Sequence, residues 1–306
     1  MSRYDGDKSA IMEMWKLCYP DVSDAFTALW FDRVYRDEQM LVAKVDGRVV
    51  SALQIVPYGM SYFGECLPAA YVCGVCTRPD ERGKGRMTRL MRRATAVMRE
   101  RGFALATLIP GEEWLFGYYR RLGYAVAFDC SVEMHRLHDA GDCRIVTAGS
   151  FTDDGLFLCY DRIQRARPCA ILHGADDLEN VRLDCRTDGG DCWVTDGADG
   201  QPAGIAFAGA TDDGTIFIKE IVCDDDSLRD AMIQALMRHY RATAARVRVP
   251  PATTGSAPFG MACVLDVGRM CDIRPPAGAV TPGDASCTQI LLQYDRRLGY
   301  MNLMLD

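Results

Sequence analysis

Hydrophobic residues in the first half of the chain follow two periods, and each period predicts one type of element. Apolar positions three and four residues apart predict amphipathic helices, whereas short continuous apolar runs predict strands. The helical period covers residues 7–17 and 23–35, and the strand-like runs cover residues 41–45, 48–56 and 68–76. Asp46 and Gly47 separate the first two runs, and this dipeptide is a strong signal of an antiparallel hairpin.

Strand and helix patterns continue to residue 128. A glycine-spaced, basic segment follows the third apolar run and opens a predicted helix that ends near Gly102. The remaining patterns predict strands at residues 103–109 and 124–128 and a short helix at residues 112–122. The first half is therefore predicted to form a sheet with helices packed against it.

The second half repeats this order of elements more weakly after a polar stretch at residues 136–150. The pattern predicts helices at residues 151–167 and 227–241 and strands at residues 191–195, 203–208 and 215–222. Because the order recurs, we expect an internal duplication. The predicted fold is mixed α/β (α+β), with two tandem units, each a mostly antiparallel central sheet flanked by helices. The predicted divisions are residues 1–138, residues 150–272 and a tail at residues 273–306.

Composition places the chain among ordinary globular proteins. Of its 306 residues, 49% are hydrophobic and 25% are charged. No signal peptide or long apolar span is evident, so we expect a cytoplasmic protein without a membrane partner. Residues 1–135 carry 18 Lys and Arg against 17 Asp and Glu, which leaves 17 against 25 in the rest. This acidic second half disfavours a nucleic-acid partner and favours a cationic small molecule. A homo-oligomer is compatible with the sequence.

The basic segment Arg82, Gly83, Lys84, Gly85, Arg86 and Met87 carries the strongest chemical signal. Backbone N–H groups at a helix start lack intrahelical partners, and the helix dipole adds positive potential there. Such a turn can bind phosphate, although glycine and charge are also common in ordinary loops. The segment is not a P-loop, because no hydroxyl residue follows Lys84, and it lacks the third glycine of a dinucleotide fingerprint. In the second half, Asp224, Asp225 and Asp226 precede the corresponding helix and would repel phosphate.

Fourteen cysteines in a chain without an export signal indicate mostly buried thiols. Cys73 and Cys76 form a C-x-x-C pattern, but residues three apart in a regular strand point to opposite faces. His135 and His138 have no neighbouring cysteine or carboxylate cluster in the sequence. We therefore expect no metal site.

Two segments together resemble the GCN5-related N-acetyltransferases (GNAT). The turn at residues 82–87 is similar to the family's Arg/Gln-x-x-Gly-x-Gly/Ala cofactor motif, with Met87 at the last position. Residues 118–124 are similar to the family's aromatic segment, and Tyr119 occupies the position of its tyrosine acid. The two-unit layout and Met87 further resemble the enhanced intracellular survival (Eis) acetyltransferases, which pair an active GNAT unit with a degenerate one.

This resemblance implies a mechanism with acetyl-CoA as cosubstrate and no metal. It places the pyrophosphate at the backbone of residues 82–87 and the pantetheine arm along the strand at Val75 and Thr77. It also implies Tyr119 as the general acid and Asp306, at the apolar tail, as the base, with Glu112 and Glu113 as alternatives. For Tyr119 and Tyr118, core packing remains the other interpretation.

The predicted activity is therefore transfer of an acetyl group from acetyl-CoA to a primary amine of a cationic, aminoglycoside- or polyamine-like molecule. One alternative is a tandem acetyltransferase of the mycothiol synthase kind, and another is a non-catalytic acyl-CoA sensor. Trp30, Phe31 and Asp32 are candidates to line the acceptor pocket, although packing is the favoured interpretation for both aromatic residues.

Overall fold

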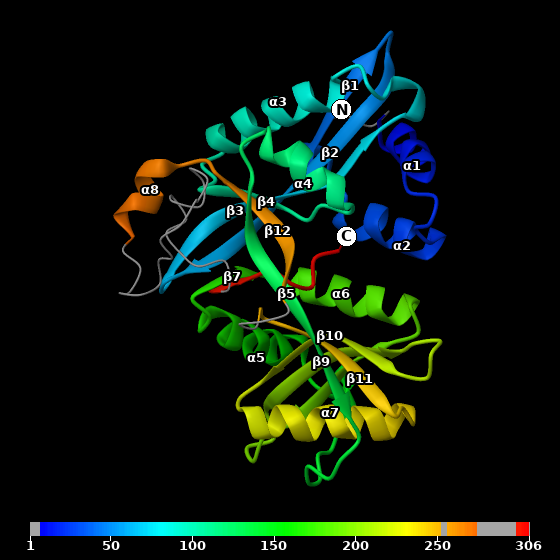
Figure 1. Cartoon of the computed structure of the whole chain (residues 1–306), viewed down its shortest axis with the longest axis vertical. Coiled ribbons are helices and arrows are strands. Elements are labelled where there is room, and N and C mark those ends of the chain that lie inside the picture. The colour runs from blue at the N-terminus through cyan, green and yellow to red at the C-terminus, as the bar shows by residue number, and fades with distance from the viewer. Residues whose placement is uncertain (1–6, 252–255, 274–297, 306) are drawn as a thin grey trace.

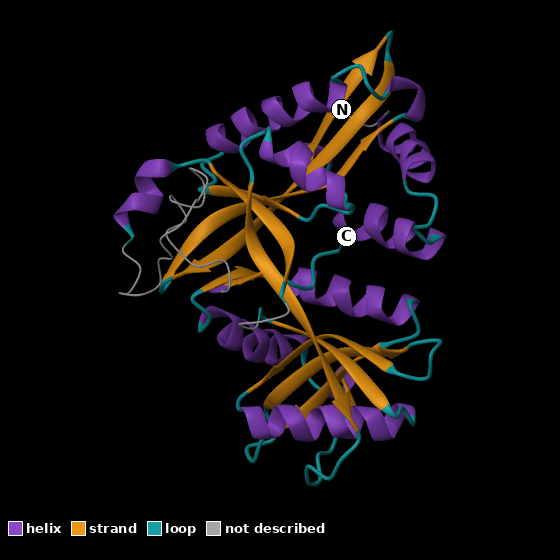
Figure 2. Ribbon diagram, in the orientation of Figure 1, coloured by secondary structure: helices purple, strands orange, loops and turns teal. Residues whose placement is uncertain are grey.

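The protein is described by a computed structural model over residues 7–251, 256–273 and 298–305 (Figure 1). It has a mixed α/β fold in which helices flank one extended, mostly antiparallel sheet (Figure 2). The elements up to β5 are α1 (Asp7–Cys18), α2 (Asp24–Leu29), a π-helical turn (Trp30–Val34), β1 (Met40–Val45), β2 (Arg48–Tyr62), β3 (Glu65–Thr77), α3 (Arg86–Glu100), β4 (Leu105–Leu108), α4 (Glu113–Arg120) and β5 (Ala125–Arg136).

The rest of the described chain begins with β6 and ends with a short strand near the C-terminus. Its elements are β6 (Val146–Thr147), α5 (Asp153–Arg165), β7 (Cys169–Leu172), α6 (Ala175–Thr187), β8 (Asp191–Asp196), β9 (Pro202–Ala210), β10 (Ile216–Cys223), α7 (Asp226–Tyr240), β11 (Ala244–Val249), β12 (Ala257–Val264), α8 (Val267–Asp272) and β13 (Gly299–Tyr300). No helix within the described ranges is long and apolar enough to cross a membrane.

The strand order of the sheet is β13-β7-β2-β3-β4-β12-β5-β11-β10-β9-β8-β6, with β1 beside β2. Two parallel pairs have a helix between their strands: α3 connects β3 to β4, and α7 connects β10 to β11. Their neighbours β1-β2-β3 and β8-β9-β10 are antiparallel. The hairpins, strands and helices predicted from the sequence are thus confirmed, although several strands are longer than their apolar runs.

Two strands pair with strands from the other half of the chain. β12 pairs with β4 and β5 of the first half, and β5 pairs with β11 of the second half. Figure 1 shows β5 running from the upper part of the sheet into the lower part. The sequence pattern did not predict this arrangement, because apolar runs do not reveal which strand they will join.

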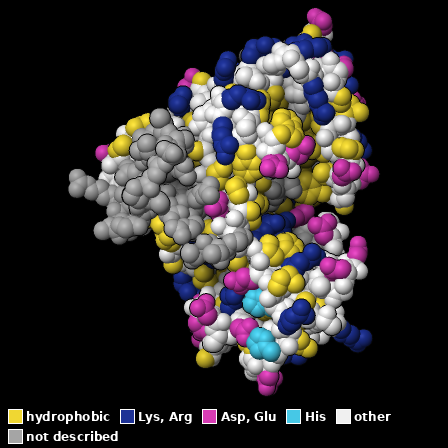
Figure 3. Space-filling model, viewed as in Figure 1, with side chains coloured by type: hydrophobic (Ala, Val, Ile, Leu, Met, Phe, Trp, Pro, Cys, Tyr) yellow, Lys and Arg dark blue, Asp and Glu magenta, His cyan; other side chains and the backbone are white. Residues whose placement is uncertain are grey.

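The helix α3 packs against the sheet as its periodicity predicts. Leu90, Met91, Ala94 and Met98 are buried, whereas the arginines of this helix lie mainly at the surface. In Figure 3, Lys and Arg side chains gather on the upper part of the molecule, over the region of α3.

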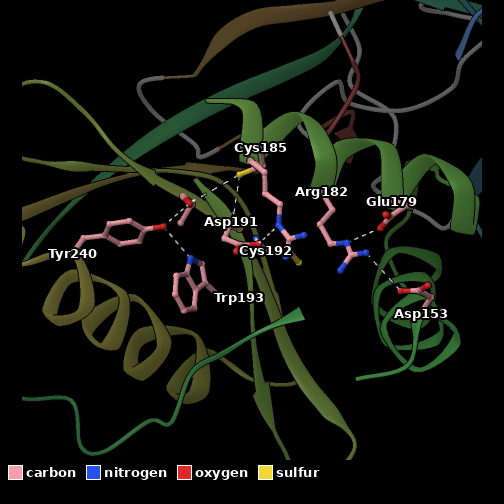
Figure 4. A network of polar contacts seen from close by, with 10 residues as sticks. Asp153, Glu179, Arg182, Cys185, Asp191, Cys192, Trp193 and Tyr240 are labelled. Atoms are coloured by element: carbon pink, nitrogen blue, oxygen red, sulfur yellow. Dashed lines mark hydrogen bonds and ion pairs between the residues drawn. The ribbon is translucent and has the colours of Figure 1, made fainter. Parts of the chain in front are cut away.

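The helix α6 was not predicted from the sequence, and its polar residues bind neighbouring elements (Figure 4). Arg182 contacts Glu179 and Asp153, and Arg186 contacts Asp191 at the start of β8. Nearby, the indole of Trp193 donates to the hydroxyl group of Tyr240 on α7. These partners give the charged residues of α6 a structural role.

Candidate active site

A bulge interrupts β3 close to its carboxyl end. The register with β2 pairs Cys73 with Gln54 and Cys76 with Ala52, so two residues of β3 stand opposite Leu53 alone. The extra residue turns Cys73 and Cys76 toward one face, and both join the core cluster beneath α1. The prediction that their sulfur atoms point to opposite faces is therefore wrong, because it assumed an unbroken strand.

Gly74 makes this bulge possible. Its φ is 58°, in the left-handed region that favours glycine. A Cβ atom at this position would lie 2.7 Å from Cζ2 of Trp15 on α1. After Gly74, the carbonyl oxygen of Val75 accepts a hydrogen bond of 3.0 Å from the hydroxyl group of Tyr19. No local motif marks Tyr19 in the sequence, because this contact joins residues 56 positions apart.

β3 separates from β4 before it reaches the bulge. The two strands pair in parallel up to Tyr71 and Thr107, and β4 ends at Leu108, whereas β3 continues to Thr77. Beyond the last pair, β3 has no strand beside it on the β4 side within the described residues, and the carbonyl oxygens of Val75 and Thr77 accept hydrogen bonds from side chains instead. The sequence-predicted residues Val75 and Thr77 both lie on this segment.

The turn after β3 places backbone N–H groups at the start of α3. Gly83 and Gly85 have φ values of 76° and 69°, and Gly85 is the N-cap residue without a side-chain cap. The first N–H groups of α3 therefore have no side-chain cap and can donate hydrogen bonds to an anion. Met87 is half-buried in the first turn and packs against the core cluster beneath α3.

Glu81 organises the cations of this turn. Its carboxylate lies 3.1 Å from Nζ of Lys84 and also contacts Arg86. The Lys84 ammonium group, followed by the Arg86 guanidinium group, lowers the pKa of Glu81. Arg82 donates through Nε to the carbonyl oxygen of Thr77 at 3.2 Å. Uncapped N–H groups and three cations fit a diphosphate, which would compete with Glu81 for Lys84 and Arg86.

Tyr119 lies on α4 with its ring in the core. The residue is 5% exposed, and its ring makes edge contacts with Tyr118 and Tyr124 at centroid distances of 5.2 and 5.9 Å. Its hydroxyl group makes no hydrogen bond within the described residues, whereas that of Tyr118 pairs with Thr88 of α3. Burial raises the pKa of Tyr119, so the phenol keeps its proton at neutral pH.

An open groove of about 460 Å³ borders α4. Glu112 and Glu113 contribute exposed carboxylates to it, and Glu112 accepts a hydrogen bond from the exposed indole of Trp114. The groove is lined by Pro110, Gly111, Glu112, Glu113, Phe116, Gly117, Arg120 and Pro258. The two carboxylates can attract a cationic ligand to this face.

The C-terminal segment that the structure describes is buried and anchored by polar contacts. Tyr300 donates to Glu220 at 2.5 Å, and Asn302 donates to the carbonyl oxygen of Lys219 at 2.7 Å. Leu303, Met304 and Leu305 belong to the same core cluster as Trp15 and Tyr71. Asp306, the predicted base, lies outside the described residues.

The residues predicted as an acceptor lining divide into two groups. Trp30 and Phe31 are 3% and 2% exposed, and the indole of Trp30 donates to Gln54. These contacts support core packing for both aromatic residues, while Asp32 is exposed. No cluster of three or more metal-ligating side chains occurs among the described residues.

Known proteins resemble this chain in sequence over residues 4–127 and in fold over most of its length. Residues 4–127 match the acetyltransferase (GNAT) domain family. No curated protein matches the chain at a significant level.

Solved structures with a similar fold include three bacterial proteins. A probable N-acyltransferase from Enterococcus faecalis V583 has a TM-score of 0.72 at 15% identity, and the match covers 85% of this chain and 70% of that chain. A GCN5-related N-acetyltransferase from Kribbella flavida has a TM-score of 0.72 at 17% identity, with 90% and 73% covered. Eis1 from Mycobacterium abscessus has a TM-score of 0.70 at 16% identity, with 92% and 76% covered. At such low identities, these matches establish a common fold.

Proposed function

We propose, on the premise that residues 4–127 are an acetyltransferase (GNAT) domain, that the protein acetylates a primary amine of a cationic small molecule. GNAT enzymes use acyl-CoA, and acetyl-CoA is the proposed donor here. The acceptor belongs to the aminoglycoside- or polyamine-like class. The observation that carries the proposal is the uncapped, glycine-shaped start of α3 directly after the open edge of β3.

The cofactor lies along β3 and the following turn in this proposal. The pantetheine arm, which carries amide groups, extends the sheet at Val75 and Thr77, and the pyrophosphate binds the N–H groups of residues 82–87. The backbone near Val75 stabilises the oxyanion that forms when the amine attacks the thioester. These assignments agree with the bulge, which reorients the backbone at this point.

Tyr119 is the proposed general acid, which protonates the departing thiolate of CoA. The phenol carries its proton at neutral pH, as a general acid must, because burial raises its pKa further above neutrality. Asp306 remains the proposed base, and the burial of Leu305 beside the first half of the chain supports it. Deletion of Leu305 and Asp306 should abolish turnover, whereas unchanged activity would transfer the role to Glu112 or Glu113.

The second half of the chain is proposed to be a degenerate copy of the first, with divisions at residues 1–138 and 150–272. The repeated order of strands and helices supports this. The strand order supports it too, because β5 of the first half lies beside β11, and β12 of the second half lies between β4 and β5. Its helix α7 starts differently from α3, because the side chain of Asp225 caps it by accepting from the N–H group of Leu228. A carboxylate already occupies the place that a phosphate would take, so acyl-CoA binds only the first unit.

The test mixes the reduced protein with acetyl-CoA and a panel of amines while free thiol is measured. Thiol release with a polyamine or aminoglycoside supports the proposal. Activity only on a cysteinyl sugar would favour the mycothiol synthase alternative, because the acceptor amine then belongs to a thiol sugar. Tight CoA binding without turnover on any amine would favour the sensor alternative.

A further inference from the structure

Three cysteines, Cys18, Cys73 and Cys76, contribute to one core cluster beneath α1, next to the proposed cofactor strand. The bulge turns Cys73 and Cys76 toward α1, where Cys18 ends the helix. Cys76 belongs to the core cluster against which Cys18 packs, and each of these two thiols shifts the pKa of the other. Cys18 also donates through Sγ to the carbonyl oxygen of Thr77 at 3.3 Å. The cluster therefore joins the first helix to the end of β3.

The surroundings of Cys18 favour its thiolate form. Arg82 donates to the same carbonyl oxygen of Thr77, which brings its guanidinium group beside Cys18. The hydrogen bond from Cys76, followed by the interaction with Arg82, lowers the pKa of Cys18 to about 6. The contact with Cys18, together with burial, raises the pKa of Cys76. Tyr19 and Cys73 are further titratable groups near this pair, and Tyr119 also acts on Tyr19.

Cys18 and Cys76 differ in solvent exposure, and this difference indicates which of them reacts first. Cys18 is half-buried, so a small reagent can reach it, whereas Cys76 is 4% exposed. Reactive redox thiols are accessible, have a low pKa and lie beside a resolving cysteine. A metal site does not explain the cluster, because no group of metal-ligating side chains is found in the described part of the chain.

We propose that Cys18 and Cys76 are a thiol modification site that low-molecular-weight disulfides oxidise. The Cys18 thiolate attacks a disulfide RSSR, forms a mixed disulfide and releases one thiolate RS⁻. Cys76, after loss of its proton, then attacks the Cys18 sulfur atom and releases the second RS⁻. The two protein thiols are oxidised to one disulfide bond, and RSSR is reduced to two thiols.

Oxidation should weaken acyl-CoA binding, a consequence that rests on the proposed function. A disulfide bond requires the two sulfur atoms to approach to about 2.05 Å. Cys18 Sγ then no longer donates to Thr77, and the neighbouring Tyr19 is drawn away from Val75. Both changes alter the β3 backbone to which the pantetheine arm is proposed to bind.

The experiment exposes the reduced full-length protein to glutathione disulfide at pH 6 and follows each cysteine by peptide mass mapping. We expect Cys18 to react about tenfold faster than the exposed Cys66, because the larger thiolate fraction outweighs its lower nucleophilicity. The wild type should yield a Cys18–Cys76 disulfide. Cys76→Ser should instead accumulate glutathione on Cys18, and Cys18→Ser should form neither product. The half-buried Cys130 gives the matched control, since Cys130→Ser should behave like the wild type.

Calorimetry with CoA before oxidation, after oxidation and after reduction with a dithiol completes the test. We expect at least a threefold weaker affinity in the oxidised protein, with full recovery on reduction. Absence of the disulfide, or unchanged affinity once it has formed, would overturn the inference. Failure of the reduced protein to bind CoA would instead count against the proposed function, because the thiol mapping does not depend on CoA.

Discussion

The hydroxyl group of Tyr19 donates a hydrogen bond of 3.0 Å to the carbonyl oxygen of Val75. This contact fixes the second residue of the bulge from outside the sheet, since Tyr19 follows the end of α1. A helix at the beginning of the chain thus helps to set the shape of the strand that the cofactor is proposed to use.

Tyr19→Phe should raise the KM for acetyl-CoA several-fold and lower the free energy of unfolding by about 1 kcal/mol, because the variant loses one hydrogen bond. Steady-state kinetics and urea unfolding measure the two effects. Tyr35→Phe is the control, because its hydroxyl group binds Asp37. An equal rise in KM for both variants would refute a specific role for Tyr19.

Gly74→Ala should destabilise the protein by about 2–3 kcal/mol. The methyl group would be forced into a left-handed backbone conformation and against Trp15. Gly47→Ala also places alanine in a left-handed backbone conformation, but nothing lies close to its Cβ. This variant should therefore lose only about 1 kcal/mol of stability. Thermal unfolding of the two variants measures the cost of the clash as the difference between their losses of stability. Equal losses would show that the Trp15 side chain can move to accommodate the methyl group.

Glu81→Gln should tighten CoA binding about two- to fivefold at low salt, because it removes the carboxylate that competes with phosphate for Lys84 and Arg86. Calorimetry at two salt concentrations measures the gain, which should shrink at high salt. Asp80→Asn is the control, since Asp80 pairs with Arg48 and Arg78 instead. Weaker CoA binding by the Glu81 variant would mean that the carboxylate positions the cations more than it competes for them.

Tyr119→Phe should lower kcat about 10²-fold or more while CoA affinity stays within twofold, because only the acid is lost. Tyr118→Phe should retain most of the activity, since its hydroxyl group pairs with Thr88. Single-turnover kinetics and calorimetry separate chemistry from binding. A Tyr119→Phe enzyme with wild-type kcat would leave core packing as the role of this ring.

Glu220→Gln should stabilise the protein increasingly as pH rises from 4 to 7. Burial raises the pKa of Glu220, so the unfolded state releases this proton first and the free energy of unfolding falls above the unfolded pKa of about 4.3. A glutamine side chain does not titrate, so the free energy of unfolding of the variant does not fall in this way as pH rises. Urea unfolding at several pH values tests it, and a constant difference across the range would contradict the assignment.

The effect of Asp213→Asn on stability should have the opposite pH dependence. Hydrogen bonds from Thr211 and then Thr215 lower the pKa of Asp213 to about 2. Its contribution to stability is therefore present above the unfolded pKa of about 3.9 and is lost as pH falls toward 2. The difference between this variant and the wild type should shrink toward pH 2.

Local patterns were sufficient to predict the turn at residues 82–87 and the helix α3, because glycine spacing and apolar periodicity act within a few residues. They also located α4 and Tyr119. The bulge was not predictable in this way, since it depends on Trp15 packing against Gly74 from another element. For the same reason, the pairing of Cys18 with Cys76 had no signal in the sequence.

The position of β12 carries a consequence for biosynthesis. β4 has β3 on one side and β12 on the other, so the sheet of the first half includes residues 257–264. A ribosome makes the cofactor turn long before it makes that strand. Until β12 is made, the nascent N-terminal half therefore has an unpaired β4 edge, and such an edge promotes aggregation. We expect the first half to become compact only when most of the polypeptide has left the ribosome.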